Sequence, residues 1–209
     1  MDLPTALSDA LRPYLAGFFT FVAVFYTSRI AFLKSREGAE FVLPGARFCA
    51  SWWNHMVFRF FRVTIWGVCL ARAIDPGLDA YLGLWPAWQR PVVVLTGAGL
   101  LTFGFALALV SHFALGRHWR SGFDGGVPET LLEAGPYRFS RNPAFLGVML
   151  AQVGFWLALP SCFSTVCLIV GLIAVYHQML LEERHMAGRF CARSVDYYQR
   201  VRRRVERRR

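Results

Sequence analysis

The longest apolar segment of the chain is a run of 39 residues, 143–181, that contains no Asp, Glu, Lys or Arg. This run is about twice the roughly 20 residues that a helix needs to cross a bilayer. Leu159–Ser161 lies near its middle and predicts a turn. We therefore expect two membrane helices joined as a hairpin, which brings Arg141–Pro143 and Glu182-Glu183 together at one membrane surface.

Three further apolar segments precede the hairpin, so that the pattern predicts an all-α, polytopic membrane bundle in a single domain, 1–209. The weakest segment contains Arg59 and Arg62, which lie three residues apart and share one helix face. Charges inside a span are costly unless they face protein or reach the interface. The start of this segment is open, because 48–55 could instead form an interfacial helix. The five expected spans are about 14–33, 54–73, 92–115, 143–159 and 161–181.

Charge gives the expected orientation. The chain is 56% hydrophobic and carries a formal net charge of +10. Most basic residues fall on one side of the expected spans, which the positive-inside rule assigns to the cytoplasm. We expect an inner-membrane protein of bacterial type with the 116–142 loop and the C-terminal tail, 182–209, in the cytoplasm, the tail forming a helix. The arginine runs of this tail favour binding to anionic lipid headgroups rather than to nucleic acid.

The segment before the hairpin has the features of an anion-binding turn. Gly135-Pro136 is a turn pair. Asn142 and Pro143 suit the N-cap and the first position of a helix. Arg141 would then stand just outside a helix N-terminus, where partial positive charge and free N–H groups favour a carboxylate.

The acidic pair at the far end of the hairpin is expected at a helix C-terminus, where the helix dipole disfavours carboxylates. Local violations of this kind often mark functional sites. The alternative is a solvated cap in which nearby arginines neutralise Glu182 and Glu183. Aromatic faces at Tyr137, Phe139 and Phe145 can attract a cation. A ligand with a carboxylate, an ammonium group, a ribose and a sulfonium, such as S-adenosylmethionine, matches this combination.

These residues resemble a known family, the integral-membrane methyltransferases related to isoprenylcysteine carboxyl methyltransferase and phospholipid methyltransferase. The family pattern is Gly-Pro-Tyr-Arg-x-x-Arg-(His/Asn)-Pro-x-Tyr-x-Gly, a helical hairpin, Glu-Glu, and then Phe-Gly-x-x-Tyr-x-x-Tyr. The resemblance covers about the last 95 residues. Three positions depart from the pattern: Phe145 replaces a tyrosine, Cys191 a glycine and Ser194 a tyrosine. The matching residues are Gly135–Arg138, Arg141–Pro143, Gly147, Glu182, Glu183, Phe190 and Tyr197.

The resemblance implies an enzyme that uses S-adenosylmethionine and no metal. The methyl acceptor would be lipophilic or small, with a carboxylate, amine or thiol to be methylated, and would enter from the bilayer. Arg141 would orient a carboxylate, and Glu183 would accept a proton where the acceptor has one to lose. The residues implied to bind the cofactor are Gly135, Pro136, Tyr137, Arg141, Asn142, Pro143, Phe145, Gly147, Glu182 and Glu183.

Two other interpretations remain open from the sequence. One is an NADPH-binding enzyme that resembles sterol reductases, although two carboxylates would repel the 2′-phosphate of that cofactor. The other is a non-enzymatic membrane protein whose basic tail binds lipid. Gly97-Ala98-Gly99 resembles a cofactor motif of phospholipid methyltransferases, but small residues in a span more often permit close helix packing. We favour packing for this motif.

Overall fold

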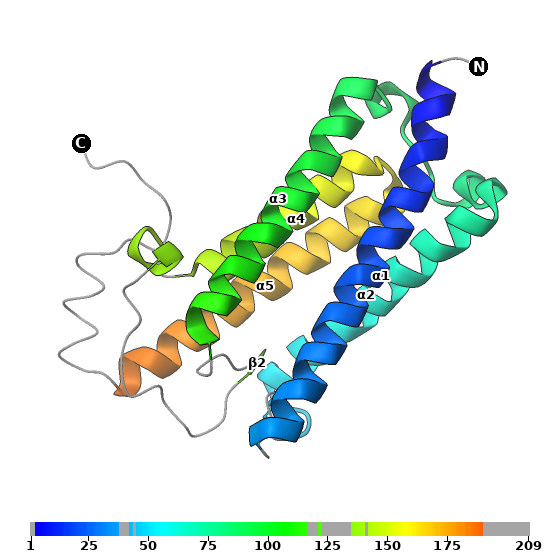
Figure 1. Cartoon of the computed structure of the whole chain (residues 1–209). Coiled ribbons are helices and arrows are strands. Elements are labelled where there is room, and N and C mark those ends of the chain that lie inside the picture. The colour runs from blue at the N-terminus through cyan, green and yellow to red at the C-terminus, as the bar shows by residue number, and fades with distance from the viewer. Residues whose placement is uncertain are drawn as a thin grey trace.

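The computed structural model describes residues 3–37, 42–43, 45–116, 121–122, 135–140 and 142–189 (Figure 1). Five long helices overlap the five predicted segments, which confirms the all-α bundle, although the first and the last helix extend well beyond their predicted bounds. The described residues add short 3-10 helices and two strands, β1 (Val42–Leu43) and β2 (Ser121–Gly122), which pair in parallel. The long helices are α1 (Leu3–Glu37), α2 (Ala50–Ile74), α3 (Pro91–Leu115), α4 (Pro143–Ala158) and α5 (Cys162–Arg189), and the 3-10 helices are η1 (Pro76–Tyr81), η2 (Pro86–Trp88) and η4 (Gly135–Arg138).

Three of the helices are long and apolar enough to cross a membrane: Ala6–Arg36, Pro91–Leu115 and Cys162–Glu182. Helix α4 is apolar but has 16 residues. Helix α2 has 25 residues and includes three arginines, which lowers its hydropathy. The chain is therefore an integral membrane protein in which a short apolar helix and an arginine-bearing helix pack beside three longer apolar ones.

The predicted hairpin turn is confirmed and is held by a reciprocal serine cap. The Ser164 amide donates to the Ser161 hydroxyl at 3.1 Å, and the Ser161 amide donates to the Ser164 hydroxyl at 3.2 Å. Both serines are fully buried. The preceding loop joins the turn, since the Trp85 amide donates to the Pro160 carbonyl at 3.0 Å. Such caps satisfy the backbone donors that a helix start leaves without partners. The cap therefore fixes the start of α5 at the turn, and the two helices of the hairpin return to the same end of the bundle.

Helices α3 and α4 approach each other through a seam of glycines, defined here as Gly97 and Gly104 of α3 with Gly147 and Gly154 of α4. A Cβ atom at Gly154 would lie 2.2 Å from the Leu101 nitrogen, and one at Gly104 would lie 2.4 Å from the Ala151 nitrogen. Small residues allow this contact between backbones. The favoured packing role is thus confirmed for Gly97, where a Cβ would lie 2.3 Å from the Ala158 nitrogen, but not for Gly99, where a Cβ would have nothing within 4 Å.

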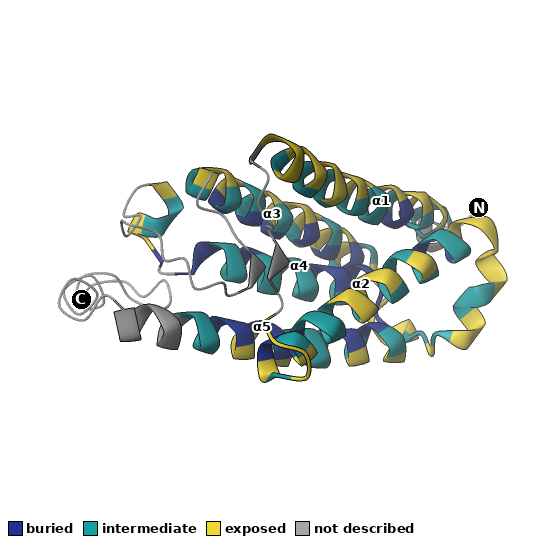
Figure 2. Cartoon of the chain, turned by 90° about the horizontal axis from the view of Figure 1, so that it is seen from below, coloured by how far each residue is buried: buried dark blue, intermediate teal, exposed yellow. Residues whose placement is uncertain are grey.

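The interior of the bundle has two halves. Near the α4–α5 turn, which we call the turn end, the core is mostly apolar. At the other end, which we call the basic end because Lys34, Arg36 and Arg47 lie there, buried polar side chains replace it, among them Asn54 and Gln178. Figure 2 shows buried residues on the inner sides of the helices and exposed residues on the outer sides. The apolar core comprises Leu11, Leu15, Cys69, Val94, Leu101, Phe155, Ala158, Leu159 and Cys167.

A cluster of charges at the turn end joins three elements. Asp79 of η1 accepts hydrogen bonds from Arg12 of α1, at 2.8 and 3.1 Å, and from Arg72 of α2. Arg72 is only 4% exposed. Burial alone would raise the pKa of Asp79, but the hydrogen bonds and charges of Arg72 and Arg12 outweigh it and hold the pKa below its ordinary 3.8. Asp79 thus neutralises a buried arginine.

Replacing Asp79 with asparagine is expected to lower the free energy of unfolding by about 2 kcal/mol. The loss is smaller than for a fully buried pair, because Arg12 still has its ion pair with Asp9. The ion-pair contribution is present above pH 3.8 and is lost as the pH falls through the lowered pKa. In detergent, Asp79→Asn should therefore melt at a lower temperature than wild type at neutral pH. This difference in melting temperature should shrink as the pH falls into the acid range. The control is Asp9→Asn, a carboxylate 57% exposed, which should change little. An equal effect of both would contradict this assignment.

Candidate active site

The predicted turn before the hairpin is confirmed and packs against the end of α3. Gly135 has a φ of +60°, which glycine adopts without strain. The amides of Phe139 and Ser140 donate to the Pro136 carbonyl at 3.1 and 3.3 Å. A Cβ at Gly135 would lie 4.0 Å from the Ala114 Cβ. Helix η4 is thus placed beside the last turn of α3, at the basic end. Its Tyr137 is half-buried.

Helix α4 begins as predicted, with Asn142 as the N-cap and Pro143 at the first helical position. Both residues are buried. The Asn142 side chain makes no capping hydrogen bond, but its backbone amide donates to the Ser140 hydroxyl at 3.2 Å. Arg141, the predicted orienting residue, lies outside the described residues. The turn therefore delivers a helix N-terminus into the protein interior.

Two predicted binding residues lie in the first turns of α4. Phe145 is half-buried. Gly147 faces α3, and a Cβ there would lie 2.6 Å from the Ala108 nitrogen. Its place in the structure is therefore a packing position, which holds the start of α4 against the end of α3.

The acidic pair lies within a helix and not at its C-terminus, so the expected helix end is wrong. Helix α5 continues to Arg189, well beyond Glu182. The dipole penalty falls off within the last turn, and Glu, Arg, Met and Ala are good helix formers that carry the helix onward. The pair is therefore compatible with helical structure. The side chain of Glu183 lies outside the described residues.

A buried amide pair leads to Glu182. The Gln178 side chain donates to a Glu182 carboxylate oxygen at 3.2 Å, and the Asn54 side chain donates to Gln178 Oε1 at 3.0 Å and to the Ala174 carbonyl at 3.1 Å. Asn54 and Gln178 are 8% and 5% exposed. This series of hydrogen bonds connects the Glu182 carboxylate on α5 to Asn54 on α2. Sequence reasoning missed both amides, although a buried amide inside an expected span usually bonds another helix.

Two polar atoms on the same face of α2 have no hydrogen-bond partner in the described structure. They are Ser51 Oγ and His55 Nε2, both buried. Ser51 and His55 flank Asn54 at helical spacing, so the three share one face of α2. A buried polar atom without a partner costs about 1–3 kcal/mol. This face of α2 lies next to the hydrogen bonds that lead to Glu182, and its two unpartnered atoms could bind a ligand.

The two ends of the hairpin lie at the basic end (Figure 1). Pro143 is 15 positions before the end of α4 at Ala158, and Glu182 is 20 positions after the start of α5 at Cys162. At 1.5 Å per residue, the difference of five positions corresponds to about 7 Å along the helix axes. The α4 start and Glu182 therefore lie at the same end of the bundle, about one and a half helical turns apart in height, as the hairpin predicted.

A comparison with protein families gives a match that includes the predicted site. A family model described as phospholipid methyltransferase matches residues 92–193. No curated protein and no solved structure is significantly similar to the chain. The matched segment contains α3, η4, α4 and α5 and therefore every predicted site residue. Residues 92–193, just under half of the chain, thus match the phospholipid methyltransferase family of membrane methyltransferases.

Proposed function

We propose that this protein transfers a methyl group from S-adenosylmethionine to a lipophilic acceptor at the membrane. The observation that carries the proposal is the return of Glu182 to the end of the bundle at which α4 begins. The N-terminus of α4, which can bind an anion, and the Glu182 carboxylate, which Gln178 holds, then lie at the same end of the bundle interior. The family match supports the reaction class, and the geometry supports a cofactor site at this end of the bundle.

The residues at this end fit the cofactor. A carboxylate has about four acceptor positions, and the described hydrogen bond from Gln178 uses one of those on Glu182. The others can accept the two hydroxyls of a ribose. The unpartnered Ser51 Oγ and His55 Nε2 offer further hydrogen bonds nearby. The carboxylate of the cofactor suits the positive end of α4, with Arg141 proposed beside it.

Bound S-adenosylmethionine supplies an electrophilic methyl group on a sulfonium, which an acceptor amine, carboxylate or thiol takes by in-line displacement. The protein's part is alignment and exclusion of water. Glu182 and the α4 start hold the two ends of the cofactor and so fix the direction of the methyl group. Glu183 is proposed to accept the proton of an amine or a thiol, whereas a carboxylate acceptor has none to lose.

The acceptor is proposed to be a membrane lipid. The basic end carries aromatic and arginine side chains together with long apolar helices, which suits a substrate that has a polar head on an apolar body. A lipid can reach this half of the bundle sideways, without leaving the bilayer. The basic tail beyond the described residues would favour anionic membranes.

The test uses the full chain in phospholipid nanodiscs with S-adenosylmethionine labelled in its methyl group. We expect label in the lipid fraction, and no consumption of NADPH by the same nanodiscs. Label that stays wholly in the cofactor and its breakdown products, across amine, carboxylate and thiol lipids, would contradict the proposal. Binding of NADPH instead of S-adenosylmethionine would favour the reductase.

A further inference from the structure

A second polar cluster lies at the basic half of the bundle, outside the family match except for His112. It joins three helices: Tyr26 and Arg29 of α1, Arg62 of α2 and His112 of α3. The Tyr26 hydroxyl lies 2.9 Å from His112 Nδ1, and Arg29 Nη2 donates to the His112 carbonyl at 3.4 Å. The Arg62 guanidinium lies 5.2 Å from the centre of the Tyr26 ring. The proposed cofactor site does not use these residues.

The named side chains of the cluster include two guanidinium groups and no carboxylate. Both guanidinium groups lie close to the Tyr26–His112 pair, Arg29 through the His112 carbonyl and Arg62 over the Tyr26 ring. Arg62 forms no ion pair with the residues that the structure describes, and it is exposed. It shares a helix face with Trp66 and with the buried Cys69, four and seven positions on, so this face is turned inward. Arg62 therefore lies on the face of α2 that is turned toward α1, with its charge still accessible at the surface.

The position of Arg62 makes that charge costly. It lies 12 positions after the start of α2 at Ala50, which is about 18 Å along the helix. Side chains on a helix lean toward its N-terminus, which for α2 is the basic end. An arginine at this depth in a membrane helix normally faces a partner of opposite charge or water. A phosphate is a fitting partner, since guanidinium groups bind its oxygens in pairs.

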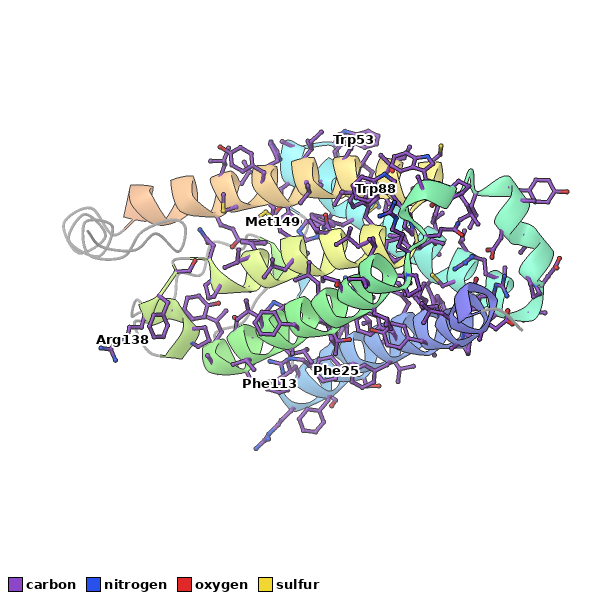
Figure 3. The ribbon with its side chains drawn as sticks, turned by 90° about the horizontal axis from the view of Figure 1, so that it is seen from above. Phe25, Trp53, Trp88, Phe113, Arg138 and Met149 are labelled. Atoms are coloured by element: carbon purple, nitrogen blue, oxygen red, sulfur yellow. The ribbon has the colours of Figure 1, made fainter. Side chains whose placement is uncertain are left out.

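An apolar groove runs along α1 beside the cluster. The groove is shallow and open to the surface, its lining residues all belong to α1, and Arg29 stands among them. Arg29 also lies over the Phe113 ring, 4.6 Å from its centre. Figure 3 shows Phe25 and Phe113 near each other where α1 passes α3, and their ring centres are 6.1 Å apart. The groove thus has a charged group beside an apolar wall, as a lipid phosphate and acyl chain require. Its lining residues are Phe21, Val24, Phe25, Ser28, Arg29 and Phe32.

We propose that this cluster is a phosphate-binding subsite for a phospholipid. The phosphodiester would lie between Arg62 and Arg29, and one acyl chain would follow the α1 groove. The lipid headgroup would then extend into the polar half of the bundle, toward the side that carries Glu182. This assignment rests on the proposed function for its role in methyl transfer, but lipid binding itself can be measured without catalysis.

The test measures lipid retention by native mass spectrometry on the detergent-purified full chain. The protein is offered dioleoylphosphatidylethanolamine and dioleoylglycerol in equal amounts, which share acyl chains and differ in the phosphate headgroup. We expect wild type to prefer the phosphate-bearing lipid about tenfold, and Arg62→Gln and Arg29→Gln each to remove most of that preference. Arg62→Lys, which keeps the charge, should retain part of it and covers the case in which Arg62→Gln fails to fold.

The matched control is Arg36→Gln. Arg36 lies on the same helix as Arg29, seven positions on, and is exposed. It should keep the wild-type preference. The subsite is overturned if wild type shows no preference, if Arg62→Gln and Arg29→Gln keep it, or if Arg36→Gln loses it equally. If the preference for the phosphate-bearing lipid depends on Arg62 but the protein transfers no methyl group, the proposed function is overturned and the subsite stands. If the protein transfers methyl groups but shows no preference for the phosphate-bearing lipid, the subsite is overturned and the proposed function stands.

Discussion

Replacing Glu182 with glutamine is expected to weaken S-adenosylmethionine binding by about 10- to 100-fold. Hydrogen bonds to a charged group are worth about 1.5–3 kcal/mol, and 1.4 kcal/mol is a factor of ten. Glutamine keeps the size of the side chain and the contact with Gln178 but loses the charge that two ribose hydroxyls would use. Calorimetry on the purified protein measures the change directly.

Two further variants make this result specific. Gln178→Leu removes the donor that holds the Glu182 carboxylate, so it should weaken binding by a smaller factor while the charge remains. Asp75→Asn removes an exposed carboxylate at the turn end and should leave binding unchanged. If Glu182→Gln binds the cofactor as wild type does, the acidic pair is the solvated cap that the sequence left open.

Replacing Gly154 with alanine is expected to destabilise the bundle by more than about 3 kcal/mol, at the upper end for overpacked cores. The new methyl group would lie 2.2 Å from the Leu101 nitrogen and 2.8 Å from the Gly97 carbonyl oxygen. These are backbone atoms, so no side-chain rotation relieves the clash and α3 must move away from α4. Both helices carry the family match, and their separation would also displace the start of α4.

Gly99→Ala is the matched control for this substitution. Gly99 lies on α3 only two residues from Gly97, yet nothing lies within 4 Å of a Cβ built on it. Alanine is favoured over glycine in helices by up to about 1 kcal/mol, so this variant should melt at or slightly above wild type in detergent. If Gly154→Ala and Gly99→Ala melt alike, the glycine seam does not hold the helices together.

The architecture was predictable because it depends on short-range patterns. An uncharged run of two span lengths with a proline at its middle permits little besides a hairpin, and the structure has one. Asn142 and Pro143 also fixed the start of α4 correctly. The end of α5 was not predictable in this way, because Glu182 marks where the apolar pattern stops, whereas a helix continues as long as its residues favour helical backbone.

The site itself was only partly predictable. The contact between Asn54 and Gln178 joins residues 124 positions apart, and no local pattern identifies such a pair before the helices are placed. Gly147 shows a second limit, since a glycine in a motif can serve a ligand or a neighbouring helix, and here it faces α3. The roles of Arg141 and Glu183 remain predictions, because their side chains lie outside the described residues.

The central claim is that the start of α4 and the acidic pair of α5 form one cofactor site. Ultraviolet photolabelling of the full chain with radiolabelled S-adenosylmethionine, followed by proteolysis and mass spectrometry, tests it most directly. We predict label within residues 135–147 and 178–189, reduced by an excess of unlabelled cofactor and lost in Glu182→Gln. Competable label confined to 97–99 of α3, or to peptides of the turn end, would contradict the account.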